Sequence, residues 1–451
     1  MAEAADPGRL PEPPGPRRGA PVRSTLAFRR DILGLVEGMQ RRYGDLARWR
    51  VGTIRFYLVA QPEWVRDILV TRHRLFIKSR ALQRARVLLG EGLLTSEGDF
   101  HLRQRRLAQP AFHRERVAAL AGEIAAISAR TAEGWRAGET VDAGREMNRM
   151  TLAIAGRTLF GAAVEDEADE IGRALTDALG LFTRLSNPLA PLLDRLPVPA
   201  TRRFHRARER LDATILRMID ERRRSGEDRE DLLGLLLAAR DEEGDGGGMT
   251  DAQLRDETLT IFLAGHETTA NALAWAWHLL GQNPEAEARF HAEVDGVLGG
   301  RLPGAADAAA LPYTRGVFAE TMRLFPPAYL IGREPREDFA LGGFRIRRRS
   351  VVLVSPWLTH RDPRFWDAPL EFRPERWTPE AEAALPRFAY FPFGGGPRKC
   401  IGEGFAWMEG ILALAMLAQR WRLRPVPGAM PRPDPLITLR AHGLRMRLEP
   451  R

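Results

Sequence analysis

Cysteine is nearly absent from this sequence. Cys400 is the single cysteine among 451 residues. One thiol cannot make an intramolecular disulfide, a CxxC zinc or iron–sulfur site, or a CxxCH haem attachment. Two interpretations remain: an inert buried thiol, which is the usual state of a cysteine, or a reactive or metal-bound one. Composition alone favours the inert thiol, so the residues around Cys400 must decide.

Long hydrophobic runs and lysine are also scarce. No stretch reaches the ~20 apolar residues of a membrane span, and no signal-peptide core is visible, so we expect a soluble, cytoplasmic protein. Lysine supplies only Lys78 and Lys399 of the 68 basic residues, and the net charge is +9. The arginines are scattered among acidic residues without a basic, aromatic-bearing stripe. We therefore expect no nucleic-acid partner.

Hydrophobic periodicity predicts a mainly α fold with small β-sheets, an α+β class. Residues 1–24, which contain PEPPGPRRGAPVR, are expected to form an extended arm, and residues 25–451 a single domain. Within that domain the patterns predict the following elements: a helix at 24–44, a hairpin at 46–60, helices over 100–240 with a break at 186–200, a flexible link at 241–248, and strands within 339–356 and 436–450.

A long apolar helix is predicted from an N-cap at Thr250 to about residue 281. Its middle, TLTIFLAGHETTANALAWAWHLL, is apolar almost all round and is expected to cross the core. Glu267 and Thr268 interrupt it beside Gly265, and the spacing places Ala264 and Thr268 on one face. A single threonine there is usually a satisfied core residue. A glycine, a glutamate and a threonine together favour a functional site.

A second motif predicts a structural ion pair. Glu320 and Arg323 lie three residues apart on a helix that the following prolines end, and Arg376 is a candidate third member. Such pairs are mostly surface contacts, but apolar flanks here indicate partial burial. The tripeptide HRD at 360–362 occurs in kinases, yet Asp367 stands where that motif needs asparagine, and no glycine-rich nucleotide loop precedes it.

Together these motifs resemble the cytochrome P450 family, over essentially the whole chain from about residue 25. The loop FGGGPRKCIG matches the family pattern F-x-x-G-x-R-x-C-x-G at every specified position, AGHETT matches the oxygen-activation helix, and the ion pair matches the structural triad. The resemblance implies haem b held between the long helix and the cysteine loop, with Cys400 as the thiolate ligand of the iron. The other cofactor-binding residues that it implies are His101, Arg105, Ala264, Gly265, Arg333, Phe393, Arg398 and Gly402. His101 departs from the family pattern, because many members have tryptophan there.

The resemblance also implies a function. The implied function is that of a haem-thiolate monooxygenase, which inserts one oxygen atom from O2 into a lipophilic substrate by hydroxylation or epoxidation. The substrate would be a compound such as a fatty acid or terpenoid. Glu267 and Thr268 would assist proton delivery. The sequence shows no flavin or ferredoxin domain, so electrons from NAD(P)H are expected to come through a ferredoxin and its reductase, or through a flavodoxin-type donor. Candidate residues of the docking surface are Arg103, Arg106, Arg114, Arg116 and Lys399.

Three alternatives stay open. One is a peroxygenase driven by hydrogen peroxide, and another is a non-catalytic thiolate-haem sensor or electron carrier. Glu267 and Thr268 argue against both, because neither needs this acid–alcohol pair. The third is a protein without haem whose cysteine is buried. A substrate pocket is expected to be lined by mostly apolar residues: Phe262, Leu263, Ala264, residues 328–331, Ile437 and Thr438. Core packing explains these residues equally well.

Overall fold

The computed structural model describes residues 7–16, 21–161, 199–226, 231–244 and 246–451. The chain forms two compact units. Unit 1 comprises Met1–Arg84, Ala328–Glu371 and Glu380–Cys400, and unit 2 comprises Ala85–Pro327, Phe372–Pro379 and Ile401–Arg451. Most of the predicted helix break at 186–200 lies outside the described residues.

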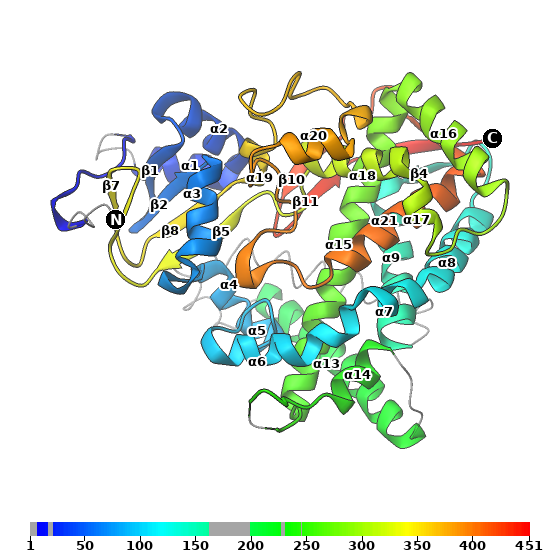
Figure 1. Cartoon of the computed structure of the whole chain (residues 1–451), viewed down its shortest axis with the longest axis horizontal. Coiled ribbons are helices and arrows are strands. Elements are labelled where there is room, and N and C mark those ends of the chain that lie inside the picture. The colour runs from blue at the N-terminus through cyan, green and yellow to red at the C-terminus, as the bar shows by residue number, and fades with distance from the viewer. Residues whose placement is uncertain (1–6, 17–20, 162–198, 227–230, 245) are drawn as a thin grey trace. The chain divides into compact units, whose positions relative to one another are not determined.

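Unit 1 is built on a five-stranded sheet with the strand order β1-β2-β8-β5-β3 (Figure 1). Its strands are β1 (Leu46–Val51), β2 (Ile54–Val59), β3 (Phe76–Lys78), β5 (Ile331–Pro335) and β8 (Val351–Val354). A hairpin, β6 (Phe339–Leu341) with β7 (Phe344–Ile346), belongs to the same unit. The helices of this part of the chain are α1 (Pro21–Arg30), α2 (Ile32–Tyr43), α3 (Pro62–Arg66), α4 (Arg80–Arg84), α19 (Pro356–Thr359) and α20 (Pro379–Ala384).

The predicted hairpin at 46–60 is confirmed. β1 and β2 pair antiparallel, and Gly52 turns the chain between them with a positive φ of 56°. The parallel partner of β2 is β8, which is buried at every position and comes from a segment nearly 300 residues later. Residues 10–16 lie against this unit, where Pro14 and Pro11 accept hydrogen bonds from the backbone of Arg48 and Arg345.

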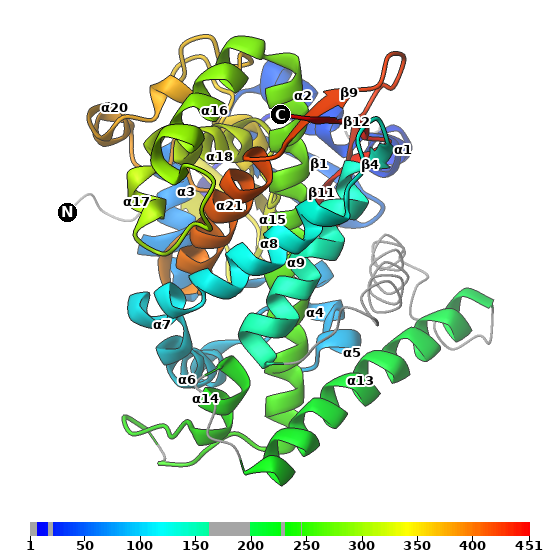
Figure 2. The ribbon, with the colours of Figure 1, turned by 90° about the vertical axis from the view of Figure 1, so that its right-hand side faces the viewer.

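Unit 2 is a helical bundle around α15 (Asp251–Gln282), beside which α9 (Ala143–Phe160) runs (Figure 2). α8 (Ala121–Gly134) packs against α9 and α21 (Glu403–Ala418). The other helices of unit 2 are α5 (Arg86–Leu89), α6 (Gly98–Ala108), α7 (Arg114–Ala119), α13 (Pro199–Ser225), α14 (Leu232–Ala238), α16 (Pro284–Leu298), α17 (Asp307–Ala310) and α18 (Pro312–Leu324). Two small sheets complete it, formed by β4 (Thr140–Asp142), β12 (Arg445–Pro450) and β9 (Trp421–Pro425), and by β10 (Arg432–Pro435) and β11 (Leu439–His442).

The start of α15 is confirmed at the expected cap. Thr250 accepts a hydrogen bond from the backbone of Gln253, whose side chain bonds back to the Thr250 amide, which is a capping box. The helix is buried almost throughout, and Trp275 and Trp277 are among the largest fully buried side chains. Burial of this kind fixes the position of the helix, because each large side chain removes ~150–250 Å² from water. The mainly α fold with small sheets is confirmed.

Candidate active site

The buried middle of α15 is interrupted by a short stripe on one face. Between Glu257 and Leu280 every residue is buried except Ala264, Gly265 and Thr268. Residues 264 and 268 are one turn apart and therefore lie on the same side of the helix. An apolar helix thus presents a patch of small side chains and one hydroxyl, which suits the approach of a flat ligand.

Thr268 and Gly265 have different roles in this stripe. The Thr268 hydroxyl donates to the carbonyl oxygen of Ala264 at 3.0 Å, the bond one turn back that its spacing predicts. At Gly265, an added Cβ would meet Leu159 at 3.4 Å and Ala155 at 4.0 Å. These are ordinary van der Waals distances, so a methyl group at position 265 would face α9 and fit there, and the open stripe consists mainly of Ala264 and Thr268.

Glu267 is buried and held by partners that the sequence did not indicate. Its side chain is 5% exposed, and Oε1 accepts from Thr438 Oγ1 at 2.9 Å and from Arg440 Nε at 2.8 Å. A second guanidinium nitrogen of Arg440 lies 2.7 Å from the same oxygen. A buried carboxylate needs such partners, because burying an unpaired charge is costly. The expected role of Thr438 in an apolar pocket is revised: its hydroxyl binds the acid.

The loop that carries Cys400 has the geometry its glycines predict. The Cys400 amide donates to the Phe393 carbonyl oxygen at 3.0 Å, and the thiol-bearing residue is exposed. Gly394 and Gly396 have positive φ values of 74° and 69°. A Cβ at Gly396 would lie 2.0 Å from the carbonyl oxygen of Leu69, so no other residue fits there without displacing the backbone.

His360 anchors the start of this loop. It is fully buried, and its Nε2 accepts a hydrogen bond of 2.9 Å from the Phe391 amide. The ring also packs edge-on against Phe391. The histidine of the HRD tripeptide therefore has a structural role, which is to hold the start of the cysteine loop. The sequence did not reveal this role, because its partner Phe391 lies 31 positions away.

The expected basic cofactor ligands fall on both units. On α6, His101 is buried and Arg105 half-buried, one turn apart on the same face. In unit 1, Arg333 is buried on β5 and Arg398 is half-buried in the cysteine loop. Gly402 comes directly before the first residue of α21. The roles of these residues toward the haem stay predictions.

The segment at 241–248, expected to be a flexible link, is fastened to α6. Arg106 donates two hydrogen bonds of 2.9 Å to the buried carboxylate of Asp241. Arg103 donates to the carbonyl oxygens of Gly247 and Gly248 at 3.1 Å. The expectation that Arg103 and Arg106 form an outward docking surface is therefore revised, because both cations are engaged within unit 2.

The predicted ion-pair triad is present and more deeply buried than expected. The side chains of Glu320 and Arg323 are 0% exposed and form a fork, with Nε at 2.8 Å and a second nitrogen at 2.7 Å from the two carboxylate oxygens. Arg376 donates to Oε1 at 3.0 Å. Two further donors were not predicted: the Arg373 amide at 3.0 Å and the Trp377 indole at 2.9 Å.

Glu409 on α21 is another buried acid that the sequence did not single out. Its side chain is fully buried, which raises the pKa of its carboxyl group well above the usual range, and among the described residues neither carboxyl oxygen has a hydrogen-bond partner. Burial therefore favours the neutral form of this carboxyl group. A helical i, i+3 pattern cannot reveal such a residue, because the helices that bury it, which include α8, α15 and α18, come from other parts of the chain.

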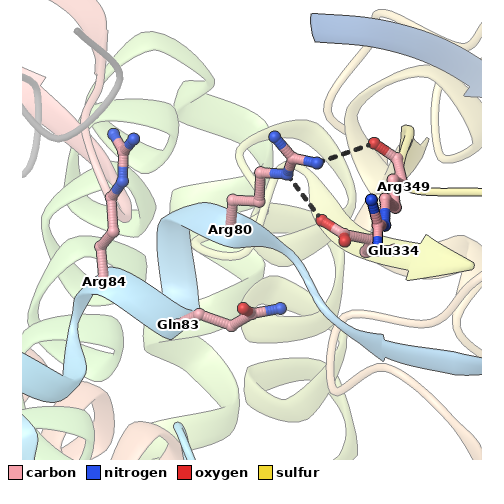
Figure 3. A pocket seen from close by; sticks show the side chains of 5 residues that line it. All are labelled: Arg80, Gln83, Arg84, Glu334 and Arg349. Atoms are coloured by element: carbon pink, nitrogen blue, oxygen red, sulfur yellow. Dashed lines mark hydrogen bonds and ion pairs between the residues drawn. The ribbon is translucent and has the colours of Figure 1, made fainter. Parts of the chain in front are cut away.

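A polar pocket of unit 1 is lined by Arg80, Gln83, Arg84, Glu334 and Arg349 (Figure 3). Arg80 reaches Glu334 and the Arg349 carbonyl oxygen, whereas Arg84 stands apart from that pair. Its lining is charged, so it does not match the apolar surroundings that a lipophilic substrate requires.

The residues of each unit fit a haem. In unit 1 the Cys400 thiol is exposed at the end of a loop that glycines hold in place. In unit 2 the stripe of Ala264 and Thr268 is open on a helix that is otherwise buried. A thiolate is a suitable axial ligand of haem iron, and small residues permit close approach to a porphyrin.

Comparison with known proteins agrees with this chemistry. The sequence model described as Cytochrome P450 matches residues 13–444. Cyclooctatin synthase of Streptomyces melanosporofaciens is 45% identical over 412 residues, which cover 91% of this chain and 89% of that protein. Cyclooctat-9-en-7-ol 5-monooxygenase of the same organism is 41% identical, covering 86% and 84%. Pentalenene oxygenase of Streptomyces avermitilis is 38% identical, covering 90% of each.

A solved structure matches the fold. The crystal structure of a cytochrome P450 (CYP102L1) superposes with a TM-score of 0.86 at 27% identity, covering 98% of this chain and all of that one. The chain belongs to the cytochrome P450 family. It is a haem-thiolate monooxygenase with haem b as its cofactor, and it inserts one atom of O2 into a lipophilic substrate with electrons from redox proteins. Among the described residues, no helix combines the length and apolarity that crossing a membrane requires.

Proposed function

We propose that this monooxygenase oxidises a terpenoid, either a cyclic hydrocarbon or an alcohol derived from one. The names of three relatives support this class: a cyclooctatin synthase, a monooxygenase of cyclooctat-9-en-7-ol and an oxygenase of pentalenene. A mostly apolar substrate also agrees with the methyl group that Ala264 presents in the open stripe of α15. Fatty acids are the second lipophilic class and serve as the comparison in the test below.

Cys400 is the proposed thiolate ligand of the haem iron. When bound, the haem supplies the activation of dioxygen, and the thiolate supplies electron density that favours O–O cleavage. Phe393 and Gly402 flank this ligand in the proposed site, and on α15 Ala264 faces the cofactor with the backbone of Gly265 beside it. His101, Arg105, Arg333 and Arg398 are the proposed partners of the two propionates, since arginine binds carboxylates through paired N–H donors.

Glu267 and Thr268 form the proposed proton path. The acid is buried next to the open stripe, and the hydroxyl lies in that stripe. The Thr268 hydroxyl donates within its own helix, so it would have to turn away from the Ala264 carbonyl oxygen before it could pass a proton into the open stripe. This pairing of an open hydroxyl with a buried, held carboxylate is the observation that carries the proposal, because a peroxygenase or a sensor has no need of it.

The proposed electron donor is a ferredoxin with its reductase, with a flavodoxin-type protein as the alternative. Arg106 is engaged by Asp241, so the proposed docking residues are now Arg114 and Arg116 on α7. Arg114 is exposed and Arg116 is half-buried. Cations there would steer an acidic donor, and the association rate would then fall as salt screens the charges.

The test is oxygenation under 18O2 with NADPH, a ferredoxin and its reductase, and catalase to remove peroxide. We expect a terpenoid alcohol to gain one 18O atom and fatty acids to react poorly. Cys400→Ala should lose both the product and the thiolate-type absorption band of the ferrous carbon monoxide complex. Thr268→Ala should keep that band and lose ~10²–10⁴-fold in product formation. Product that forms from added peroxide and is abolished by catalase would contradict the proposal in favour of a peroxygenase.

A further inference from the structure

We propose that Arg440 is a positioning residue for oxygen activation: it holds the buried carboxylate of Glu267 in one orientation for proton supply to Thr268. The inference rests on the proposed proton path and extends it to a strand near the C-terminal end. It assigns a role to a residue that belongs to none of the sequence motifs.

Three donors converge on one oxygen of Glu267. Arg440 approaches Oε1 with Nε and a second nitrogen, at 2.8 and 2.7 Å, and the Thr438 hydroxyl donates to it at 2.9 Å. Thr438 in turn accepts from the Asn271 side-chain amide at 3.0 Å, one turn further along α15. Among the described residues, Oε2 receives no hydrogen bond of this kind. The arrangement fixes one oxygen and leaves the other as the one that can exchange a proton.

The strand that carries Arg440 is itself fixed against α15. The Leu439 amide donates to the Pro327 carbonyl oxygen at 3.0 Å, and the Trp275 indole of α15 donates to the Leu439 carbonyl oxygen at 3.4 Å. Leu439 is fully buried. Arg440 therefore reaches Glu267 from a backbone with little freedom, as a positioning residue requires.

The chemistry of arginine defines what Arg440 does. A guanidinium stays protonated at any pH of interest, so it cannot pass a proton on. Beside a buried carboxylate it instead compensates the negative charge, and its paired N–H donors fix the orientation of the group. Arg440 is 23% exposed and Glu267 5%, so the pair extends from the interior toward the surface.

The other charged or titratable groups near this pair are few. His266 precedes Glu267, and burial lowers the pKa of its ring, which leaves it neutral at pH 7. Asp434 stands opposite Arg440 in the antiparallel pair of β10 and β11. Arg440 is thus the cation that compensates Glu267. A simpler view is that the ion pair only attaches β11 to α15, and the experiment must separate these two roles.

The measurement is the ratio of product formed to NADPH consumed. In coupled turnover, substrate RH, O2, NADPH and a proton give ROH, water and NADP+. In uncoupled turnover, O2, NADPH and a proton give H2O2 and NADP+. We expect Arg440→Met to lower product per NADPH about tenfold, the lower end for residues that orient a functional group, with peroxide rising to match. Arg440→Lys, which keeps the charge but not the fork, should fall between Arg440→Met and the parent.

Two further readouts separate positioning from attachment. With H2O2 as the oxidant, which already carries its protons, Arg440→Met should match the parent. Infrared spectra of the protein before turnover, with the Glu267→Gln spectrum subtracted, should show one narrow set of Glu267 carboxylate bands in the parent and shifted, broadened bands in Arg440→Met. A purely structural pair would lower stability and leave the product ratio of the folded fraction unchanged.

Arg447→Met is the matched control. Arg447 lies on β12, is 58% exposed and pairs with Glu449. It should behave as the parent in every measurement. If Arg440→Met fails to fold, Arg440→Lys still decides the question, because a parent-like product ratio in that variant overturns the inference. A parent protein without O2-dependent product would instead mean that the proposed function has failed.

Discussion

Glu320 is a carboxylate with no exposed surface, and five hydrogen bonds hold it. Arg323 supplies two, and Arg376, the Arg373 amide and the Trp377 indole supply one each. These hydrogen bonds compensate the cost of burying the charge, so the buried ion pair adds little stability compared with an apolar core of the same size. Loss of one partner, however, leaves an uncompensated buried charge.

Glu320→Gln tests this point with little change in shape. We expect the variant to lose about 3–5 kcal/mol of unfolding free energy, because Arg323 stays buried without its anion. Urea unfolding followed by tryptophan fluorescence and haem content measures the effect. Glu375→Gln is the control, since Glu375 lies nearby with a side chain 48% exposed. Equal unfolding midpoints for the two variants would show that the buried charge is not costly.

At the scale of elements, the loop before α21 depends on glycine where two backbones approach each other. Gly396 needs glycine on two counts, its φ of 69° and the Leu69 carbonyl oxygen 2.0 Å from any Cβ. Gly404, eight residues later and inside α21, has nothing within 4 Å of the same position. Two glycines of one segment therefore have opposite tolerance for a methyl group.

Gly396→Ala and Gly404→Ala make a matched pair. Gly396→Ala should lower the unfolding free energy by at least ~1–2 kcal/mol, the cost of a left-handed backbone conformation for a residue with a side chain. The loss should be larger still, because the loop must move away from Leu69. The same substitution should lower the fraction of protein purified with haem. The second should bind haem normally and gain up to about 1 kcal/mol of helix stability. Haem content per protein measures both, and full haem loading of Gly396→Ala would contradict the loop geometry.

For the whole molecule, buried titratable groups set how stability depends on pH. His278 lies in α15, with its ring edge-on to Trp275, and burial lowers its pKa to about 4. Between pH 4 and its ordinary value near 6.5 the unfolded chain binds a proton that the folded protein does not. The contribution of His278 is therefore fully present above pH 6.5 and is lost as the pH falls toward 4.

His278→Phe should remove this dependence. Through His278 the parent should lose up to about 3 kcal/mol of unfolding free energy between pH 6.5 and 4, at ~1.4 kcal/mol per pH unit. The variant, which lacks this group, should lose correspondingly less. Unfolding free energies from urea titrations at several pH values measure the slope. The exposed His205, replaced by phenylalanine in the same way, controls for loss of a histidine as such. Parallel slopes for parent and His278→Phe would contradict the assignment.

The sequence by itself determined the elements and residues whose chemistry is local. Thr250 caps α15, Gly52 turns the hairpin, Glu320 and Arg323 meet one turn apart, and the glycines around Cys400 shape its loop. Each depends on spacing within a few residues, where helix or turn geometry decides which atoms meet. The family motifs are of this kind, which is why the haem-thiolate class could be inferred before the structure.

The tertiary structure alone decided which distant residues serve those motifs. Arg440 and Thr438 bind Glu267 although they are 173 and 171 residues away in the sequence. Trp377 binds Glu320 from 57 residues away, and Arg106 binds Asp241 from 135 residues away. Arginine is so frequent in this chain that composition cannot tell a ligand of a buried acid from a surface cation. A buried charge takes whichever donor packing brings within hydrogen-bond reach, and only the folded chain specifies that donor.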